Sequence, residues 1–360
     1  MLKYGIVGCG MMGQEHLRNI ALLPDVEVAA ILEPDAEQAA RAQAIAPHAQ
    51  QVADLAAMAA RPDLDALVIA SPNFMHVDQL RTIYGQCAKP LLVEKPVMTR
   101  ADEAATLMGL TQDRAAPIWV AMEYRYMPPL AAFLSELDSV TGGVKMLSIR
   151  EHRFPFLEKV NHWNRFNAQT GGTLVEKCRH FFDLMRLVMG SEPFRISASG
   201  GQAVNHRDET YGGATPDIWD NAYVIVDFTC GGRAMLDLCM FAEGARFQEE
   251  ICAIGPAGKL EARVPGPTRF WPGDAGPAPV AELELSPRFP KSPEVRAIPV
   301  PEDLLEAGDH NGATFYQHQK FAAVVAGRAQ PEVTLDDGIR AVSMGLAAQE
   351  AARDGKVVVL

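Results

Sequence analysis

The 360-residue sequence lacks the features that mark membrane proteins and nucleic-acid-binding proteins. No apolar run reaches the ~18 residues that a membrane-spanning helix needs, so we expect no transmembrane segment. No run of lysine or arginine offsets the formal net charge of -12, which disfavours nucleic acid and anionic membranes as partners. A neutral small molecule is a better fit for such a chain.

Cysteine is also scarce and unpaired. The six cysteines show no CxxC spacing and mostly lie in apolar stretches, so we expect neither a disulfide framework nor a metal site. No targeting signal precedes the first strand-like segment, residues 3–7, and a cytoplasmic protein is expected. The length exceeds what one hydrophobic core usually serves, which predicts two domains.

The first third of the sequence alternates short apolar runs with amphipathic stretches. This alternation predicts βαβ units and a parallel sheet covered on both faces, a doubly wound, Rossmann-type α/β domain over residues 1–122. Its strands are expected at residues 3–7, 26–32, 64–70, 91–93 and 118–122.

Residues 123–360 have a different pattern, with strand-like segments in succession. They predict an α+β domain with a large, open, mostly antiparallel sheet. Residues 265–301, rich in proline and glycine, are interpreted as a long surface excursion. Two closing helices, 314–326 and 335–352, either complete this domain or dock on the first. The strands are expected at residues 144–153, 195–204, 222–228, 234–241 and 249–254.

Apolar side chains lie on both faces of the later strands. Tyr223 and Ile225 alternate with Val224 and Val226, although an antiparallel sheet in a monomer normally leaves one face polar. We therefore expect one face to be buried under helices and the other against a second subunit, in a homodimer or homotetramer.

A glycine motif, GxGxxG, follows the first expected strand and opens the first helix. The first glycine permits a tight turn, the second lets a pyrophosphate approach the backbone, and the third allows close helix-to-strand packing. The helix N-terminus then presents free N–H groups to the phosphates. The alternative is an ordinary glycine turn. The motif consists of Gly8, Cys9, Gly10, Met11, Met12 and Gly13.

Glu33 ends the second expected strand, where a carboxylate accepts hydrogen bonds from the adenosine ribose. A carboxylate there repels a 2′-phosphate, and Pro34 follows in place of an arginine that would bind one. The pattern favours NAD over NADP as cofactor, with a solvated glutamate as the bland alternative.

Lys95 lies in a Glu-Lys-Pro sequence directly after the apolar strand at residues 91–93. The carboxyl ends of parallel strands line the ligand crevice, so Lys95 is expected where the nicotinamide would lie. A lysine at that place can exchange a proton with a substrate hydroxyl. The alternative is a surface lysine on a loop.

A second candidate lies in a helix expected to begin at Gly171 and Gly172 and to continue to about Met189. Glu176 and His180 are four residues apart, so they would share one helix face, with Asp183 near it. A carboxylate beside an imidazole orients the ring and raises its basicity, as a general base requires. An ordinary helical ion pair is the alternative.

Together these residues resemble the Gfo/Idh/MocA family, the group of glucose-fructose oxidoreductase and inositol dehydrogenase. The resemblance extends over nearly the whole chain and implies a Rossmann domain followed by a mixed domain with a large open sheet. It is carried by the glycine loop and Glu33, residues 70–73 with His76, residues 94–96, residues 125–128, the glycine-led helix to His180, and residues 333–338.

The resemblance implies that Lys95 hydrogen-bonds the reacting hydroxyl and that His180 is the general acid or base. It places Glu176 on a neighbouring substrate hydroxyl. His76 either flanks the cofactor or caps the helix that it begins. The cofactor-binding residues implied beyond the glycine loop and Glu33 are Ser71, Pro72, Asn73, His76, Glu94 and Arg125.

The sequence departs from the family pattern at this site. Glu176 stands where the family commonly has aspartate, and Cys178 where it has glycine, so the substrate is in question more than the reaction. Trp163 is expected either as a stacking wall for a sugar ring or as buried packing. Four basic residues either admit an acidic sugar or are solvated surface charges: Arg153, Arg165, Lys177 and Arg179.

The sequence thus predicts an NAD-dependent oxidoreductase that acts on a secondary alcohol of a sugar, inositol or related polyol. Two alternatives are an NAD-dependent glycoside hydrolase that oxidises its substrate transiently and a non-catalytic NAD-binding regulator. A regulator would have no need of Lys95, Glu176 and His180 together, which argues against it.

Overall fold

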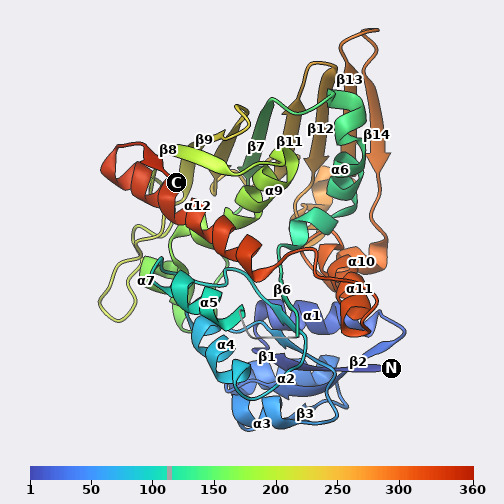
Figure 1. Cartoon of the computed structure of the whole chain (residues 1–360), viewed down its shortest axis with the longest axis vertical. Helices are drawn as coiled ribbons and strands as arrows, with labels where there is room; N and C mark the ends of the chain where they lie inside the picture. The colour runs from blue at the N-terminus through green and yellow to red at the C-terminus, as the bar shows by residue number, and fades with distance from the viewer. Residues whose placement is uncertain (112–115) are drawn as a thin grey trace.

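The computed structural model describes residues 1–111 and 116–360 and contains two sheets, one in each half of the molecule (Figure 1). The N-terminal sheet has six strands in the order β3-β2-β1-β4-β5-β6, and every neighbouring pair is parallel. The predicted Rossmann-type sheet is confirmed. Its strands are β1 (Leu2–Val7), β2 (Val26–Leu32), β3 (Gln50–Gln51), β4 (Ala66–Ile69), β5 (Leu91–Val93) and β6 (Ile118–Val120).

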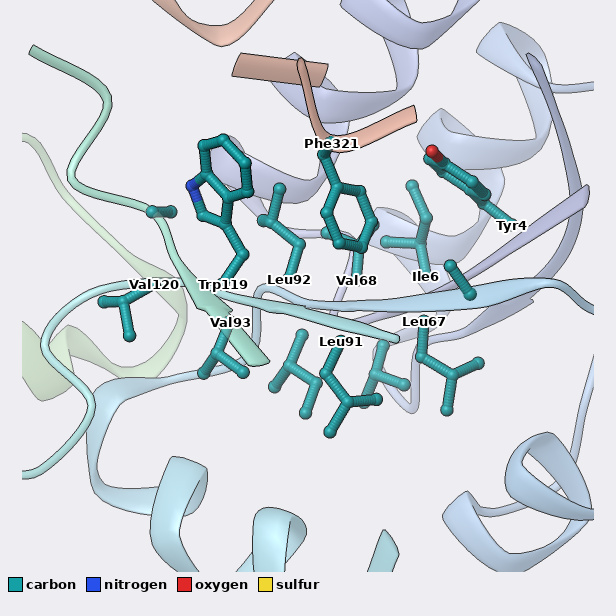
Figure 2. Packing of buried hydrophobic residues seen from close by; sticks show 14 of the residues in the cluster. Tyr4, Ile6, Leu67, Val68, Leu91, Leu92, Val93, Trp119, Val120 and Phe321 are labelled. Atoms are coloured by element: carbon teal, nitrogen blue, oxygen red, sulfur yellow. The ribbon is translucent and has the colours of Figure 1, made fainter. Parts of the chain in front are cut away.

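Strands β4 and β5 and the second half of β1 are buried on both faces, as the continuous apolar runs predict, whereas the two-residue edge strand β3 is exposed. Figure 2 shows Ile6, Val68 and Leu92 on one face, and Leu91 and Val93 on the other. The connecting helices are α1 (Met11–Ala21), α2 (Ala36–Ile45), α3 (Leu55–Ala60), η1 (Asn73–Met75), α4 (His76–Tyr84) and α5 (Glu103–Thr111).

Both closing helices contribute to this arrangement. Phe321, on α11 (Ala313–Val325), packs against Tyr4 and Trp119 of the N-terminal sheet, with ring centroids 5.7 and 6.3 Å away (Figure 2). Helix α12 (Leu335–Asp354) contacts β8 and α9 in one half and β6 and α5 in the other. The two closing helices therefore complete the second domain and also dock on the first, the two arrangements that the sequence left open. The domain limits at residue 122 stay a prediction.

The second sheet has nine strands in the order β14-β13-β12-β11-β7-β10-β9-β8-β15. All neighbouring pairs are antiparallel except β7 with β10, so the expected mostly antiparallel sheet is confirmed. The strands are β7 (Met146–His152), β8 (Pro193–Gly201), β9 (Asn221–Phe228), β10 (Arg233–Cys239), β11 (Glu249–Ile254), β12 (Gly258–Val264), β13 (Ala281–Pro287), β14 (Glu294–Ile298) and β15 (Val358–Val359).

The interpretation of residues 265–301 as a surface excursion is wrong for much of that segment. It contains two short 3-10 helices, η4 (Thr268–Phe270) and η5 (Gly273–Ala275), and then β13 and β14, which extend the sheet. Leu283 and Leu285 are buried and alternate with the half-buried Glu282 and Glu284, as a strand requires. The prolines and glycines on either side masked this alternation.

Helices cover one face of the second sheet and leave its other face exposed. Val224 and Val226 are fully buried, whereas Tyr223 and Ile225 on the opposite face are 62% and 49% exposed. This pattern agrees with the two-sided apolar character of the strands. The remaining helices are η2 (Glu123–Tyr126), α6 (Pro128–Thr141), η3 (Val160–Arg165), α7 (Asn167–Thr170), α8 (Thr173–Glu176), α9 (Arg179–Met189) and α10 (Glu302–Ala307).

Within residues 1–111 and 116–360, none of the helices combines the length and the apolarity that a membrane crossing demands. All six cysteines lie in the described residues, and none of them forms a disulfide bond. In the same residues, no cluster of His, Cys, Asp or Glu side chains is arranged to hold a metal ion.

Candidate active site

The glycine loop between β1 and α1 has the geometry of a phosphate cradle. Gly8 has φ +87°, and a Cβ on it would lie 2.5 Å from the Ser71 nitrogen. A Cβ on Gly13 would lie 2.1 Å from the Gly8 oxygen, whereas one on Gly10 would meet no atom within 4 Å. Gly8 and Gly13 are therefore required for packing. Gly10 instead leaves open space at the start of α1, where no side chain caps the helix.

Glu33 lies directly beside this loop. Its carboxylate accepts hydrogen bonds from the backbone N–H of Cys9 at 2.6 Å and of Asp35 at 2.9 Å. Both acids line the large cavity, and so does Arg41, which the sequence reasoning missed and which pairs with Glu37. Two acids and a paired arginine thus line this cavity at the end of β2.

This cavity has a volume of about 930 Å³, within the range that suits a cofactor. It is lined by the turns after β1, β2, β4 and β5 and, from the other half of the chain, by residues such as Trp163. A smaller cavity of about 100 Å³ adjoins it. The two share Met11, Met12, Lys95, Lys159 and Glu176 as lining residues.

Lys95 stands at the junction of the two cavities, and its side chain is 11% exposed. Its ammonium lies 3.6 Å from Glu94, whose carboxylate is also 3.1 Å from Nε2 of His16. Burial alone would raise the pKa of Glu94, but Lys95 and His16 hold that pKa far below its usual value. His16 in turn contacts His318 of α11 at 2.8 Å. Because its pKa is lowered, Glu94 is an anion, and its carboxylate holds the Lys95 ammonium in place.

His180 lies in the smaller cavity and is 2% exposed. Its ring stacks on Tyr124, with centroids 4.1 Å apart and planes 5° apart. Burial, followed by the positive charge of Lys95, lowers the pKa of His180 well below its usual value. The imidazole is therefore neutral, and its Nδ1 has no hydrogen-bond partner in the part of the chain that the structure describes.

The predicted pairing of Glu176 with His180 is wrong. The expected helix is broken after Glu176, so α8 ends there and α9 begins at Arg179. Glu176 instead accepts hydrogen bonds from Asn73 and from Lys159 at 3.4 Å. Because of this break, Glu176 and His180 do not lie one turn apart on a continuous helix, as the spacing had predicted. Glu176 still faces both cavities.

Arg125 and Asp183 form an ion pair of their own. The guanidinium donates two hydrogen bonds to the Asp183 carboxylate, at 2.6 and 2.5 Å, and a third to the Glu332 carbonyl. Neither residue lines either cavity. The pair joins η2 to α9, which gives Arg125 a structural contact in place of the expected cofactor contact.

Ser71, Pro72 and Asn73 line the large cavity as expected, but His76 does not. His76 is fully buried, and its two ring nitrogens contact the Ser71 carbonyl at 2.9 Å and the Pro96 carbonyl at 2.7 Å. It therefore ties the loop after β4 to the loop that carries Lys95, which is neither of the two roles expected for it.

Trp163 lines the large cavity and is 9% exposed. The Lys159 ammonium lies 4.4 Å above its ring, and Phe74 meets it edge to face at 6.1 Å. Trp163 lines the large cavity and not the smaller one, so the prediction that it forms a stacking wall for a sugar ring in the smaller cavity finds no support.

Of the four basic residues singled out, three line the smaller cavity: Arg153, Lys177 and Arg179. Arg165 does not, and pairs with Glu209 at 3.4 Å. Lys177 donates to the Tyr124 hydroxyl at 2.5 Å and contacts Glu151 at 2.7 Å.

Sequence reasoning missed several groups that the fold brings to this place. Tyr124, Lys159 and His310 all line the smaller cavity, from η2, the segment before η3 and the loop before α11. They belong to segments far apart in the chain, so no spacing pattern could find them. Tyr124 alone could have been suspected from the sequence, because it directly precedes residues 125–128, which carry part of the family resemblance.

Two family models match this chain. The Gfo/Idh/MocA family model for the oxidoreductase family, NAD-binding Rossmann fold, matches residues 2–122, and its C-terminal alpha/beta domain model matches residues 138–263. The rhizopine catabolism protein MocA of Rhizobium meliloti is 27% identical over 76% of this chain and 80% of its own length. Inositol 2-dehydrogenase of Rhizobium meliloti is 25% identical over 65% of this chain and 68% of its own.

Solved structures show the same fold. A levoglucosan dehydrogenase in complex with NADH superposes with a TM-score of 0.81, at 17% identity, covering 99% of this chain and 98% of that one. The agreement extends over both sheets, so the two halves of the chain are arranged as in that enzyme.

Proposed function

The chain belongs to the Gfo/Idh/MocA family of NAD-binding oxidoreductases, and from this we propose that it oxidises a secondary alcohol of a sugar, inositol or related polyol with NAD. One observation carries the proposal. Lys95, at the end of β5, and His180, on α9, line the same small cavity where it opens onto the cofactor-sized one. An ammonium and a neutral imidazole from the two halves of the chain can then reach one hydroxyl group.

The residues present fit NAD, because Gly10 leaves space at a helix N-terminus and Glu33 stands beside it. When bound, the nicotinamide C4 supplies the acceptor for the hydride that leaves the substrate carbon. Lys95 donates a hydrogen bond to the hydroxyl oxygen and orients it. His180 accepts the hydroxyl proton as the carbonyl forms, so one hydride and one proton leave the alcohol.

We propose NAD as the preferred form of the cofactor. Glu33 and Asp35 would repel a 2′-phosphate, and Arg41 is already paired with Glu37. Parallel titrations with NADH and NADPH test this preference. Equal affinity for the two would remove it.

The function is tested by a substrate screen. Inositols, aldoses and sugar acids are incubated with NAD or NADP, and the absorbance of the reduced cofactor is followed. Net reduction that depends on a polyol supports the dehydrogenase. Sugar-dependent glycosidic cleavage without net reduction indicates the hydrolase alternative, and cofactor binding with neither reaction indicates the regulator.

We further propose a cytoplasmic homo-oligomer assembled through the exposed face of the nine-stranded sheet. Tyr223, Ile225 and Met235 are 62%, 49% and 40% exposed on neighbouring strands of that face. Light scattering at micromolar concentration, before and after Ile225→Lys, tests it. A monomeric mass for the unmodified chain would contradict the assembly.

A further inference from the structure

The wall of the smaller cavity carries far more basic than acidic side chains. Its acids are Glu176 and Asp309, and Asp309 is already paired with Arg269 at 2.5 Å. Glu176, the other acid, forms its ion pairs with cations that themselves line the wall. The basic side chains on the wall are Lys95, Arg153, Lys159, Lys177, Arg179 and His310.

Two of these cations share one carboxylate oxygen. Oε1 of Glu151 lies 2.7 Å from the Lys177 ammonium and 3.2 Å from the Arg153 guanidinium. Burial and then the neighbouring Glu151 raise the pKa of Glu249, whose carboxylate accepts a hydrogen bond from Gln248. Among the described residues, Lys177 and Arg153 both form their ion pair with the Glu151 carboxylate.

Two other cations on the wall likewise share one carboxylate. Glu176 lies 3.4 Å from Lys159 and 3.7 Å from Arg179, so it also serves two cations. Arg179 is 1% exposed, and its Nε has no hydrogen-bond partner among the described residues. A buried guanidinium N–H without an acceptor is costly, so this wall is incomplete as it stands.

His180 lies inside this positive field. Burial lowers its pKa first, and the charged groups that lower it further are all cations: Lys95, Arg179, Lys177 and His310. A neutral imidazole surrounded by cations is a weak proton acceptor, because the imidazolium would be repelled. A bound anion would relieve that repulsion.

We propose that the substrate is a sugar or polyol acid whose carboxylate lies against Lys177, Arg153 and Arg179. This inference rests on the proposed function, since the reacting hydroxyl is the one that lies between Lys95 and His180. The carboxylate accepts charge-assisted hydrogen bonds from cations that share too few acids.

The binding experiment compares matched ligands on the NADH-loaded protein by calorimetry. D-glucuronate and D-galacturonate each have an amide, D-glucuronamide and D-galacturonamide, of nearly the same shape without the charge. We expect at least one acid to bind about tenfold or more tightly than its amide, as a charged hydrogen bond predicts. Equal affinities on both scaffolds, or tighter binding of glucose 6-phosphate than of either acid, would overturn the proposal.

Two variants locate the effect. Lys177→Met and Arg153→Gln should each reduce the acid-to-amide affinity ratio at least fivefold, whereas the surface variant Lys291→Met should keep it. Arg153 is the more accessible of the two, so Arg153→Gln decides the matter if Lys177→Met fails to fold. A ratio unchanged in a folded variant contradicts the assigned contacts.

The failure of this inference is distinct from that of the proposed function. Reduction of NAD by neutral and acidic polyols at equal kcat/KM removes the carboxylate contact and keeps the dehydrogenase. Tight binding of an acid with no reduction of NAD by any polyol removes the dehydrogenase.

Discussion

The large cavity and the small cavity are built in different ways. The large one is lined mainly by strand-to-helix turns, where glycines and backbone N–H groups make the surface. The small one is lined by charged side chains from four separate stretches of the chain. A surface made by backbone follows from local sequence, whereas a surface made by converging charges depends on the whole fold. The four predictions that follow test this difference.

Lys95 gives the largest expected effect, because it lines both cavities and is proposed to bind the reacting hydroxyl. Lys95→Met should lower kcat by about 10²–10⁴-fold, as loss of an acid-base group does, with little change in the Kd of NADH. Steady-state kinetics and NADH fluorescence titration measure the two quantities. Lys291→Met is the matched surface control, and an unchanged kcat in Lys95→Met would remove the assignment.

The Arg125–Asp183 pair should matter for stability rather than for cofactor binding. Asp183→Asn removes the buried carboxylate from a guanidinium that is 11% exposed and should cost about 3 kcal/mol of unfolding free energy. The exposed pair of Arg195 with Asp227 provides the control, since Asp227→Asn should cost less than about 1 kcal/mol. Urea denaturation measures both. A weakened NADH affinity in a folded Asp183→Asn protein would instead restore a cofactor role for Arg125.

The glycine loop separates packing from ligand approach. Gly13→Ala places a Cβ 2.1 Å from the Gly8 oxygen and should lower the Tm even without cofactor. Gly10→Ala meets nothing within 4 Å, so its Tm without cofactor should be unchanged while NADH binding weakens about tenfold or more. Thermal melts and NADH titrations of the two variants distinguish these outcomes. A normal NADH affinity in Gly10→Ala would place the pyrophosphate elsewhere.

The smallest effect concerns pH. Burial opposes the charge on His310, but Glu15 and Glu123 raise its pKa from 6.5 to about 9, against the weaker repulsion of Lys95. A raised folded-state pKa stabilises fully below pH 6.5, and that stability is lost as the pH rises through about 9. The unfolding free energy should fall on the order of 2 kcal/mol between pH 6.5 and 8.

His310→Gln should flatten that decline, as measured by urea denaturation across the interval. Tyr124 and Asp309 also neighbour the ring, and Asp309 stays paired with Arg269. Above pH 8 the unfolding free energy has two opposing contributions. Deprotonation of His310 lowers it, whereas deprotonation of Lys177, whose pKa burial lowers to about 8, raises it. An identical slope in the variant between pH 6.5 and 8 would exclude His310 as its source.

Sequence reasoning succeeded where the pattern was local. The parallel sheet, the glycine loop and Glu33 are all read within one βαβ unit, and the structure has them in the expected order. It failed for β13 and β14, because proline and glycine in the flanking segments outweighed a short alternation. It also failed at Glu176, where the chain departs from a continuous helix at Lys177.

The amino-acid sequence by itself determined the fold class, the cofactor loop and the presence of Lys95 and His180, because each depends on residues close together in the chain. The tertiary structure alone decided what surrounds them. Tyr124 under His180, His16 behind Glu94 and the ring of cations around the small cavity come from segments tens to hundreds of residues apart. Long-range packing brings these charges together, and no local spacing encodes which charges will share a carboxylate.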